Sequence, residues 1–136
     1  MRFLARFFLC IVVCWHVLHA NQYADNMQIS LQKDEQKKIL VKYGATEKLF
    51  TMRWTLYHNG GLVLLRSYDK VVAQNVLYLQ HKNQSFRVQL KPSGASVSNV
   101  PYLLVQFKAF DFEKKEALFE LFLSDKEMIT TIKFLE

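Results

Sequence analysis

Apolar side chains occupy every second position along much of this chain. Between residues 50 and 56 the even-numbered residues are apolar and the odd-numbered ones are polar, and residues 86–90 repeat the pattern. Side chains of a β-strand alternate between its two faces, so this period is typical of strands with one buried face. No long segment repeats apolar residues at the spacing of a helix. The sequence therefore predicts an all-β fold.

Short polar segments separate the predicted strands. Residues 57–61 include Asn59, Gly60 and Gly61 and predict a hairpin, because asparagine and glycine readily adopt the positive backbone angles of tight turns. Further reversals are expected at residues 68–70, 81–84, 113–116 and 124–127. The result is about eight or nine short strands, with sequence neighbours paired. Only the segment 91–101 has the length expected of a crossing from one sheet to another.

An antiparallel β-sandwich with a core centred on Trp54 is the predicted architecture, because about seven or more short strands in roughly a hundred residues commonly pack as two sheets. An up-and-down β-barrel stays open as the alternative, since a run of short hairpins also closes into a barrel of about eight strands. In the strand that starts at Leu103, the apolar residues change from odd to even positions after Ala109. A side chain cannot change face without an extra residue, so we expect a β-bulge near Ala109 and Phe110.

Residues 1–20 are predicted to be an N-terminal signal peptide helix, so that residues 21–136 form a single all-β domain. Arg2 and Arg6 precede an apolar run at residues 7–18, and Ala20 provides a small residue at the end. At about 1.5 Å per residue this run is shorter than a bilayer core of ~30 Å, and cleavage would leave no stable transmembrane span. The expected location is periplasmic or secreted, with an inner-membrane anchor through an uncleaved leader as the alternative.

Removal of the leader would also remove Cys10 and Cys14, the two cysteines of the chain. The remaining residues would then form no disulfide, thiol nucleophile or cysteine metal site. The net charge of +6 would fall to +4, from 16 basic and 12 acidic residues, and these charges are mixed in sign along the chain. A modest charge without a basic cluster does not favour nucleic acid as a partner.

The sequence predicts no catalytic residues, no metal site and no other cofactor. His58 and His81, the histidines outside the leader, each adjoin a predicted turn, and two imidazoles alone make a poor metal site. Asp69 or Asp111 would be needed to complete a ligand set. The serines of the segment 91–101 lack the spacing of a nucleophile elbow. We therefore expect a protein that is not an enzyme, with a hydrolase only as a third alternative.

Aromatic residues expected on the surface, one of them near an arginine, provide the candidate binding residues. By the period of two, Tyr57 is expected on the same outward face as Arg53, and Phe122 on the same face as Glu120. His58 adjoins Tyr57 at the predicted turn. Aromatic and arginine side chains are enriched in protein interfaces, so we predict binding through Arg53, Tyr57, His58 and Phe122. The alternative is that a second sheet or another subunit covers these aromatic side chains.

Four segments of the chain resemble small exported, periplasmic bacterial proteins of uncharacterised function. They are Arg-Trp-Thr-Leu-Tyr at 53–57, Asn-Gly-Gly-Leu-Val at 59–63, Val-Pro-Tyr-Leu-Leu at 100–104 and Glu-Ala-Leu-Phe at 116–119. The resemblance spans residues 49–123. It implies a periplasmic location and supplies no catalytic residues.

These patterns predict a non-enzymatic, exported β-sandwich that binds another envelope protein through a sheet edge or an exposed aromatic face. Edge strands present unpaired backbone groups, to which a partner strand readily adds. The main alternative is a small β-barrel carrier with an enclosed apolar pocket of ~300 Å³ or more, lined by core aromatics. The sequence leaves the oligomeric state open.

Overall fold

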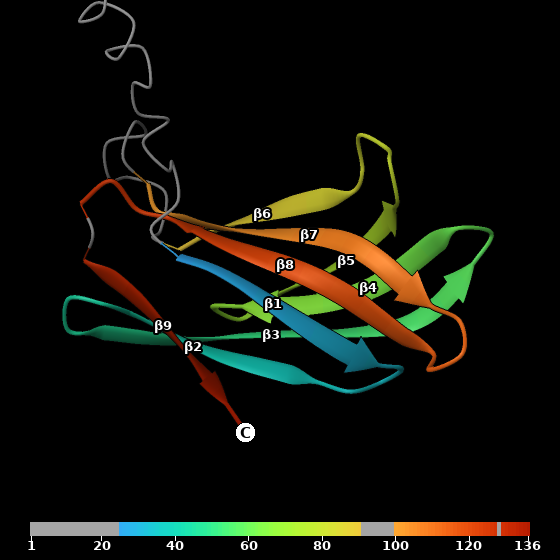
Figure 1. The fold of residues 1–136 in the computed structure, drawn as a ribbon. Helices are drawn as coiled ribbons and strands as arrows, with labels where there is room; N and C mark the ends of the chain where they lie inside the picture. Colours follow the sequence, from blue (N-terminus) through green and yellow to red (C-terminus); the bar gives the residue numbers. More distant parts are fainter. Residues whose placement is uncertain (1–24, 91–99, 128) are drawn as a thin grey trace, which may run out of the picture.

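The computed structural model describes residues 25–90, 100–127 and 129–136, and these form nine β-strands in two antiparallel sheets (Figure 1). The strands are β1 (Asp25–Gln32), β2 (Lys37–Tyr43), β3 (Thr46–His58), β4 (Gly61–Tyr68), β5 (Val71–Tyr78), β6 (Ser85–Gln89), β7 (Tyr102–Asp111), β8 (Glu116–Ser124) and β9 (Thr130–Leu135). The described residues contain no helix. The predicted all-β class is confirmed in a sandwich-like form, whereas the predicted signal peptide at residues 1–20 lies outside the described residues.

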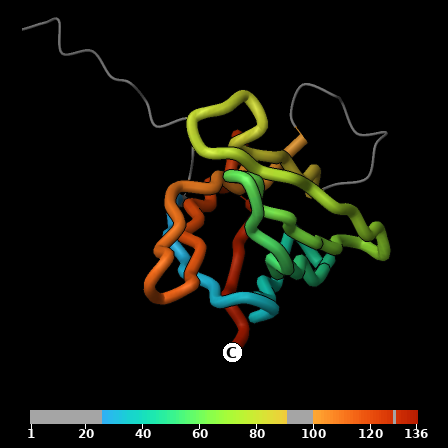
Figure 2. Tube along the Cα trace, turned by 90° about the vertical axis from the view of Figure 1, so that its right-hand side faces the viewer, coloured from blue at the N-terminus to red at the C-terminus, as the bar shows by residue number. Residues whose placement is uncertain are grey.

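One sheet, here called sheet A, has the strand order β1-β8-β7-β6, and the other, sheet B, has the order β5-β4-β3-β2-β9. Figures 1 and 2 show the two sheets facing each other, and the chain passes between them after β1, after β5 and after β8. The crossing expected at residues 91–101 is wrong, because the strands on either side of this segment, β6 and β7, pair within sheet A. Facing sheets lie only about 10 Å apart, so shorter connections are long enough to cross.

The core lies between the two sheets and consists of the inward-facing residues of both. Phe50 of β3, Phe107 of β7 and Phe119 of β8 are fully buried. Trp54 is 3% exposed, and its indole N–H donates a hydrogen bond of 2.7 Å to the carbonyl oxygen of Leu31 in sheet A. The predicted Trp54-centred core is therefore confirmed, and the indole links sheet B to sheet A.

Two tight turns in sheet B have both of their central residues in the left-handed backbone region. Asn59 and Gly60, with φ of 50° and 77°, join β3 to β4 and confirm the hairpin predicted there. Asp69 and Lys70, with φ of 48° and 67°, join β4 to β5 at the second predicted reversal. Turns of this kind match the right-handed twist of the strands that they connect.

A β-bulge interrupts the pairing of β7 with β8. The register shifts between Phe107 and Ala109, which leaves Lys108 as the extra residue. The bulge predicted in this strand is confirmed, one residue before the predicted pair Ala109 and Phe110. Gln84 forms two hydrogen bonds with the backbone of Phe107, the residue before the bulge. Its side-chain amide donates to the Phe107 carbonyl at 2.8 Å, and its own backbone carbonyl accepts from the Phe107 N–H at 2.9 Å.

A second bulge, which the period of two does not predict, lies in β3. Its pairing with β4 shifts just after Trp54 and leaves Thr55 as the extra residue. The alternation therefore changes face beyond this point, and the expectation that Tyr57 shares the outward face of Arg53 is wrong. Tyr57 instead packs against the core, and its ring stacks on Phe110 of sheet A with centroids 4.0 Å apart and an interplanar angle of 12°.

Asp125, which follows β8, fixes the start of the connection to β9. Its carboxylate accepts hydrogen bonds from the backbone N–H groups of Glu127, Ile129 and Thr130 at 3.1, 3.1 and 2.7 Å. Burial alone would raise the pKa of Asp125, but hydrogen bonds from Thr130, Glu127 and Ile129 outweigh it and lower the pKa below its ordinary value. The folded chain therefore favours the ionised carboxylate.

Candidate binding site

The four residues predicted for binding lie in different parts of the molecule. Arg53 is exposed on the outer face of sheet B, and His58 is exposed at the end of β3. Phe122 lies with Glu120 on the outer face of sheet A, as expected from the burial of their neighbours in β8. Tyr57 lies between the sheets. The fold therefore does not assemble them into one surface, and their role in binding stays a prediction.

The two histidines considered for a metal site lie at the same end of sheet B. Gly61, which follows the β3–β4 turn beyond His58, pairs with Tyr78 of β5. The ring of His81 lies against that of Tyr78, with centroids 5.8 Å apart. The hairpins thus bring His58 and His81 to one end, as the metal hypothesis required.

The acidic residues considered as their partners are engaged elsewhere. Asp69 lies at the opposite end of β4 and forms an ion pair with Lys48. Asp111 accepts hydrogen bonds from the backbone N–H groups of Glu113 and Lys114 in its own turn, at 2.9 and 3.0 Å. Within the described ranges, no three His, Cys, Asp or Glu side chains are grouped so that they would hold a metal ion.

β5 forms one edge of sheet B, and its open side carries backbone groups that do not bond to β4. The N–H of Tyr78 donates to the carbonyl of Asn83 at 3.2 Å, so it points away from β4. Backbone direction alternates along an antiparallel strand. The N–H and C=O groups of Val72, Gln74 and Val76 therefore also line the open edge.

β5 lacks the charged residues and the proline that often protect an edge strand. The edge strands β6 and β9, in contrast, contain Arg87 and Lys133. Val71 and Val72 are 65% and 74% exposed. A long, uncharged and exposed edge is a template on which another strand can pair.

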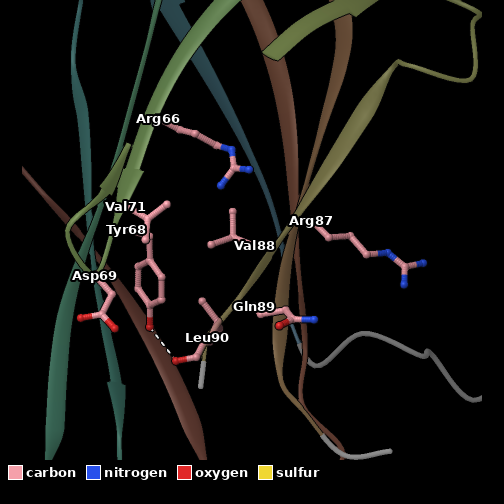
Figure 3. A pocket seen from close by; sticks show the side chains of 8 residues that line it. All are labelled: Arg66, Tyr68, Asp69, Val71, Arg87, Val88, Gln89 and Leu90. Carbon is pink, nitrogen blue, oxygen red and sulfur yellow. Dashed lines mark hydrogen bonds between the residues drawn. The ribbon is translucent and has the colours of Figure 1, made fainter. Parts of the chain in front are cut away.

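A cleft of about 350 Å³ opens beside this edge, between the β4–β5 turn and β6 (Figure 3). Its lining residues are Arg66, Tyr68, Asp69, Val71, Arg87, Val88, Gln89 and Leu90. In Figure 3 the side chain of Arg66 extends between the sheets toward Val88, whereas Arg87 and Gln89 point away from it. Residues of sheet B thus line one side of the cleft and residues of β6 line the other, and several of these side chains are apolar.

Arg66 is the charged group that reaches into this space. Its Nε donates a hydrogen bond of 2.8 Å to the side-chain oxygen of Asn75, and its guanidinium lies 4.9 Å from the centroid of the Phe86 ring. Burial lowers the pKa of Arg66. Among the residues that the structure describes, no carboxylate forms an ion pair with it.

A hydrogen bond between two lining residues of the cleft links the two sheets at the end away from Arg66 (Figure 3). The hydroxyl of Tyr68 donates to the carbonyl oxygen of Leu90 at 2.7 Å, and burial raises the pKa of this hydroxyl. Leu90 follows β6, and its own N–H donates to the carbonyl of Pro101 at 2.9 Å. Tyr68 and Leu90 therefore hold the two sides of the cleft together at this end.

Sequence reasoning missed this cleft, although β4 carries a signal for it. Leu62, Leu64, Arg66 and Tyr68 share one face of β4 by the period of two, so an arginine stands in line with three core residues. The residues 62–65 also form one continuous apolar run, and this run hides the alternation.

Comparison with known protein families finds no matching family model, and comparisons with curated proteins and with solved structures find no match. The resemblance to small exported bacterial proteins therefore stays a prediction. In the described part of the chain there is also no helix long and apolar enough to cross a bilayer.

Proposed function

We propose that this chain is an exported, non-enzymatic binding protein of the bacterial envelope, which binds an extended segment of another envelope protein along the open edge of β5. The observation that carries the proposal is the edge itself, which is uncharged, lacks proline and exposes its valines. Addition of a strand to such an edge provides main-chain hydrogen bonds for affinity and alternate side-chain contacts for specificity.

The backbone of β5 offers these hydrogen bonds at three positions. Val72, Gln74 and Val76 direct their N–H and C=O groups away from β4, as the bond from Tyr78 to Asn83 indicates. A partner strand placed there would continue sheet B by one strand.

Apolar side chains on the outer face of sheet B extend the contact beyond the backbone. Val76 pairs with Val63 of β4, and Val63 pairs with Leu56 of β3. Val76 and Leu56 are 38% and 52% exposed. An added strand would prolong this row with its own outward side chains, so we expect it to carry apolar residues at alternate positions.

A photo-crosslinking amino acid at Gln74 tests the proposal in cells that produce the full chain. We expect a covalent adduct with one other protein. The matched control is the same amino acid at Lys133 of β9, the opposite edge of sheet B, which should give none. Absence of an adduct at Gln74, equal adducts from both positions, or an adduct with a second copy of this chain would contradict the proposal.

Substitution of Val72 by proline tests whether the backbone edge is used. Because the Val72 N–H faces the open side, Val72→Pro removes a donor from the edge without removing a bond to β4. The adduct at Gln74 should disappear while the melting temperature changes little. Ala73→Pro is the contrasting variant, because the N–H of residue 73 faces β4, and its loss leaves a β4 carbonyl without its donor and should destabilise the fold by about 1–3 kcal/mol.

A further inference from the structure

The cleft beside β5 contains a cation on the inner face of a sheet. Arg66 follows Leu62 and Leu64 along that face of β4, and its guanidinium lies over the ring of Phe86. Removal of a charge from water is unfavourable unless an opposite charge or hydrogen bonds compensate for it. The lowered pKa of Arg66 reflects this loss of water. Arg66 is half-buried, so its guanidinium has lost part of its water, and an anion in the cleft would compensate for that loss.

The guanidinium of Arg66 has a hydrogen-bond partner at Nε but none at its terminal nitrogens among the described residues. The hydrogen bond from Nε to Asn75 fixes the orientation of the planar group. Two parallel N–H groups in this arrangement match the two oxygens of a carboxylate.

No acidic residue of the cleft lining pairs with the Arg66 guanidinium. Asp69 is the acidic residue that lines the cleft, but it lies at the end away from Arg66 in Figure 3 and pairs with Lys48. The walls between these two ends include Val71 and Val88, with Leu90 beyond them. The cleft thus has a cation at one end and aliphatic side chains along its length.

We propose that this cleft binds the carboxylate of an aliphatic acid, with Arg66 holding the carboxylate and Val71 and Val88 contacting the hydrocarbon part. The volume of about 350 Å³ lies at the lower end of the range for small-molecule pockets, roughly 300–1,000 Å³, which suits a short chain. Free fatty acids and the C-terminus of a peptide that ends in an aliphatic residue share this chemistry. The site is separate from the edge hydrogen bonds of the proposed function.

Titration of the purified protein with octanoate, followed by NMR, tests the proposal directly. We expect saturable shifts of the Arg66 Nε–H and of the Val88 methyl groups. Octanol and octylammonium have the same number of carbon atoms but no carboxylate, and they should cause no comparable shifts. Equal shifts with octanol would overturn the proposal, because they would show apolar partitioning rather than recognition of the carboxylate.

A peptide arm distinguishes the two sources of the carboxylate. An acetylated Val-Leu dipeptide with a free C-terminus is compared with its C-terminal amide. Binding of octanoate assigns the cleft to a free acid. Binding of the peptide acid alone, with no binding of its amide or of octanoate, assigns the cleft to a peptide terminus. Failure of both acids to bind overturns the proposal and leaves the crosslinking test of β5 unaffected.

Two pairs of variants locate the binding in the cleft. Arg66→Met removes the charge, and its matched control is Arg53→Met on the outer face of the same sheet. Val71→Trp fills the cleft at a residue that is 65% exposed, and its control is Val72→Trp, at a residue that is 74% exposed and lies outside the cleft lining. We expect both cleft variants to weaken binding about tenfold or more and both controls to retain it.

Because Val71 is exposed, Val71→Trp should fold and decides the question even if Arg66→Met does not fold. Unchanged affinity in the folded cleft variants would overturn the proposal. Equal weakening in Val71→Trp and Val72→Trp would do the same.

Discussion

The hydroxyl of Tyr68 donates its hydrogen bond to the carbonyl of Leu90, just beyond the end of the β6–β7 ladder, where proline at position 101 provides no donor. The ladder ends at Gln89 and Tyr102, and its register continued by one residue places Leu90 opposite Pro101, where the N–H of Leu90 bonds to the carbonyl of Pro101. Proline has no N–H to return the bond. A side chain of sheet B therefore satisfies a backbone group that sheet A leaves unpaired.

We predict that Tyr68→Phe lowers the free energy of unfolding by about 1–3 kcal/mol, because it leaves the buried Leu90 carbonyl without a donor. Denaturant unfolding measures this change. Tyr102→Phe is the control, since its ring lies against Arg87 on the outer face of sheet A, and it should change stability little. Equal losses in the two variants would contradict the interpretation.

Because Pro101 lacks the N–H that would bond to the Leu90 carbonyl, replacing this proline provides a second test of the Tyr68 hydrogen bond. Pro101→Ala restores a backbone N–H opposite Leu90. In that background Tyr68→Phe should cost about 1 kcal/mol less than in the natural sequence, because the ladder now supplies the donor. A double-mutant cycle by denaturant unfolding measures the difference, and strictly additive effects would refute the pairing.

The stack of Tyr57 on Phe110 should appear as coupling between the two sheets. We predict an interaction energy of about 0.5–1.5 kcal/mol in a double-mutant cycle of Tyr57→Leu and Phe110→Leu. Tyr57 and Phe122 lie on opposite sides of sheet A and provide the control pair, for which we expect additivity. An outward-facing Tyr57 would give no coupling in either cycle.

The lowered pKa of Asp125 predicts a loss of stability in acid. The carboxylate stabilises the fold fully at pH values above the ordinary Asp pKa of about 3.9. This contribution is lost as the pH falls through the lower pKa of the folded state. Asp125→Asn should therefore cost about 1–3 kcal/mol at pH 7 and progressively less below pH ~4.

Urea unfolding of the wild-type chain and of Asp125→Asn, between pH 7 and values below pH ~4, measures how their difference in stability depends on pH. Asp34→Asn, in the exposed β1–β2 turn, is the control, because asparagine tolerates the positive φ of 63° at this position. A difference between wild type and Asp125→Asn that is constant with pH would show that ionisation is not its cause.

Backbone strain at Lys70 offers a stabilising substitution. Its φ of 67° in the β4–β5 turn is unfavourable for a residue with a Cβ by about 1–2 kcal/mol, whereas glycine adopts it without strain. Lys70→Gly should raise the free energy of unfolding by about 0.5–1 kcal/mol after the greater entropy of the unfolded glycine is included. Thermal unfolding tests this, and Lys70→Ala, which keeps the strain, should show no such gain.

The period of two predicted the all-β class, the hairpin at Asn59 and the core around Trp54, because burial of one face controls which residues alternate. It located the bulge in β7 to within one residue, since the apolar positions themselves change there. The bulge at Thr55 left no such sign: Tyr57 is aromatic, and an aromatic residue fits either face. One extra residue therefore misplaced a predicted binding residue.

The candidate sites depend on relationships that a local pattern does not contain. The arginine on the inner face of β4 was readable from alternation with Leu64, but its lack of an acidic partner was not. The openness of β5 depends on strand order, because the same residues in a central strand would have no open edge. Sequence alone does not determine which strand ends a sheet.

The indole of Trp54, hydrogen-bonded to Leu31 across the two sheets, is an intrinsic fluorescent probe of the contact between the sheets. The chain has two tryptophans, and the other, Trp15, lies in the predicted leader. In a processed chain Trp54 would be the sole indole fluorophore. Its emission should shift to longer wavelength as soon as water enters between the sheets, so separation of the layers is observable without any added label.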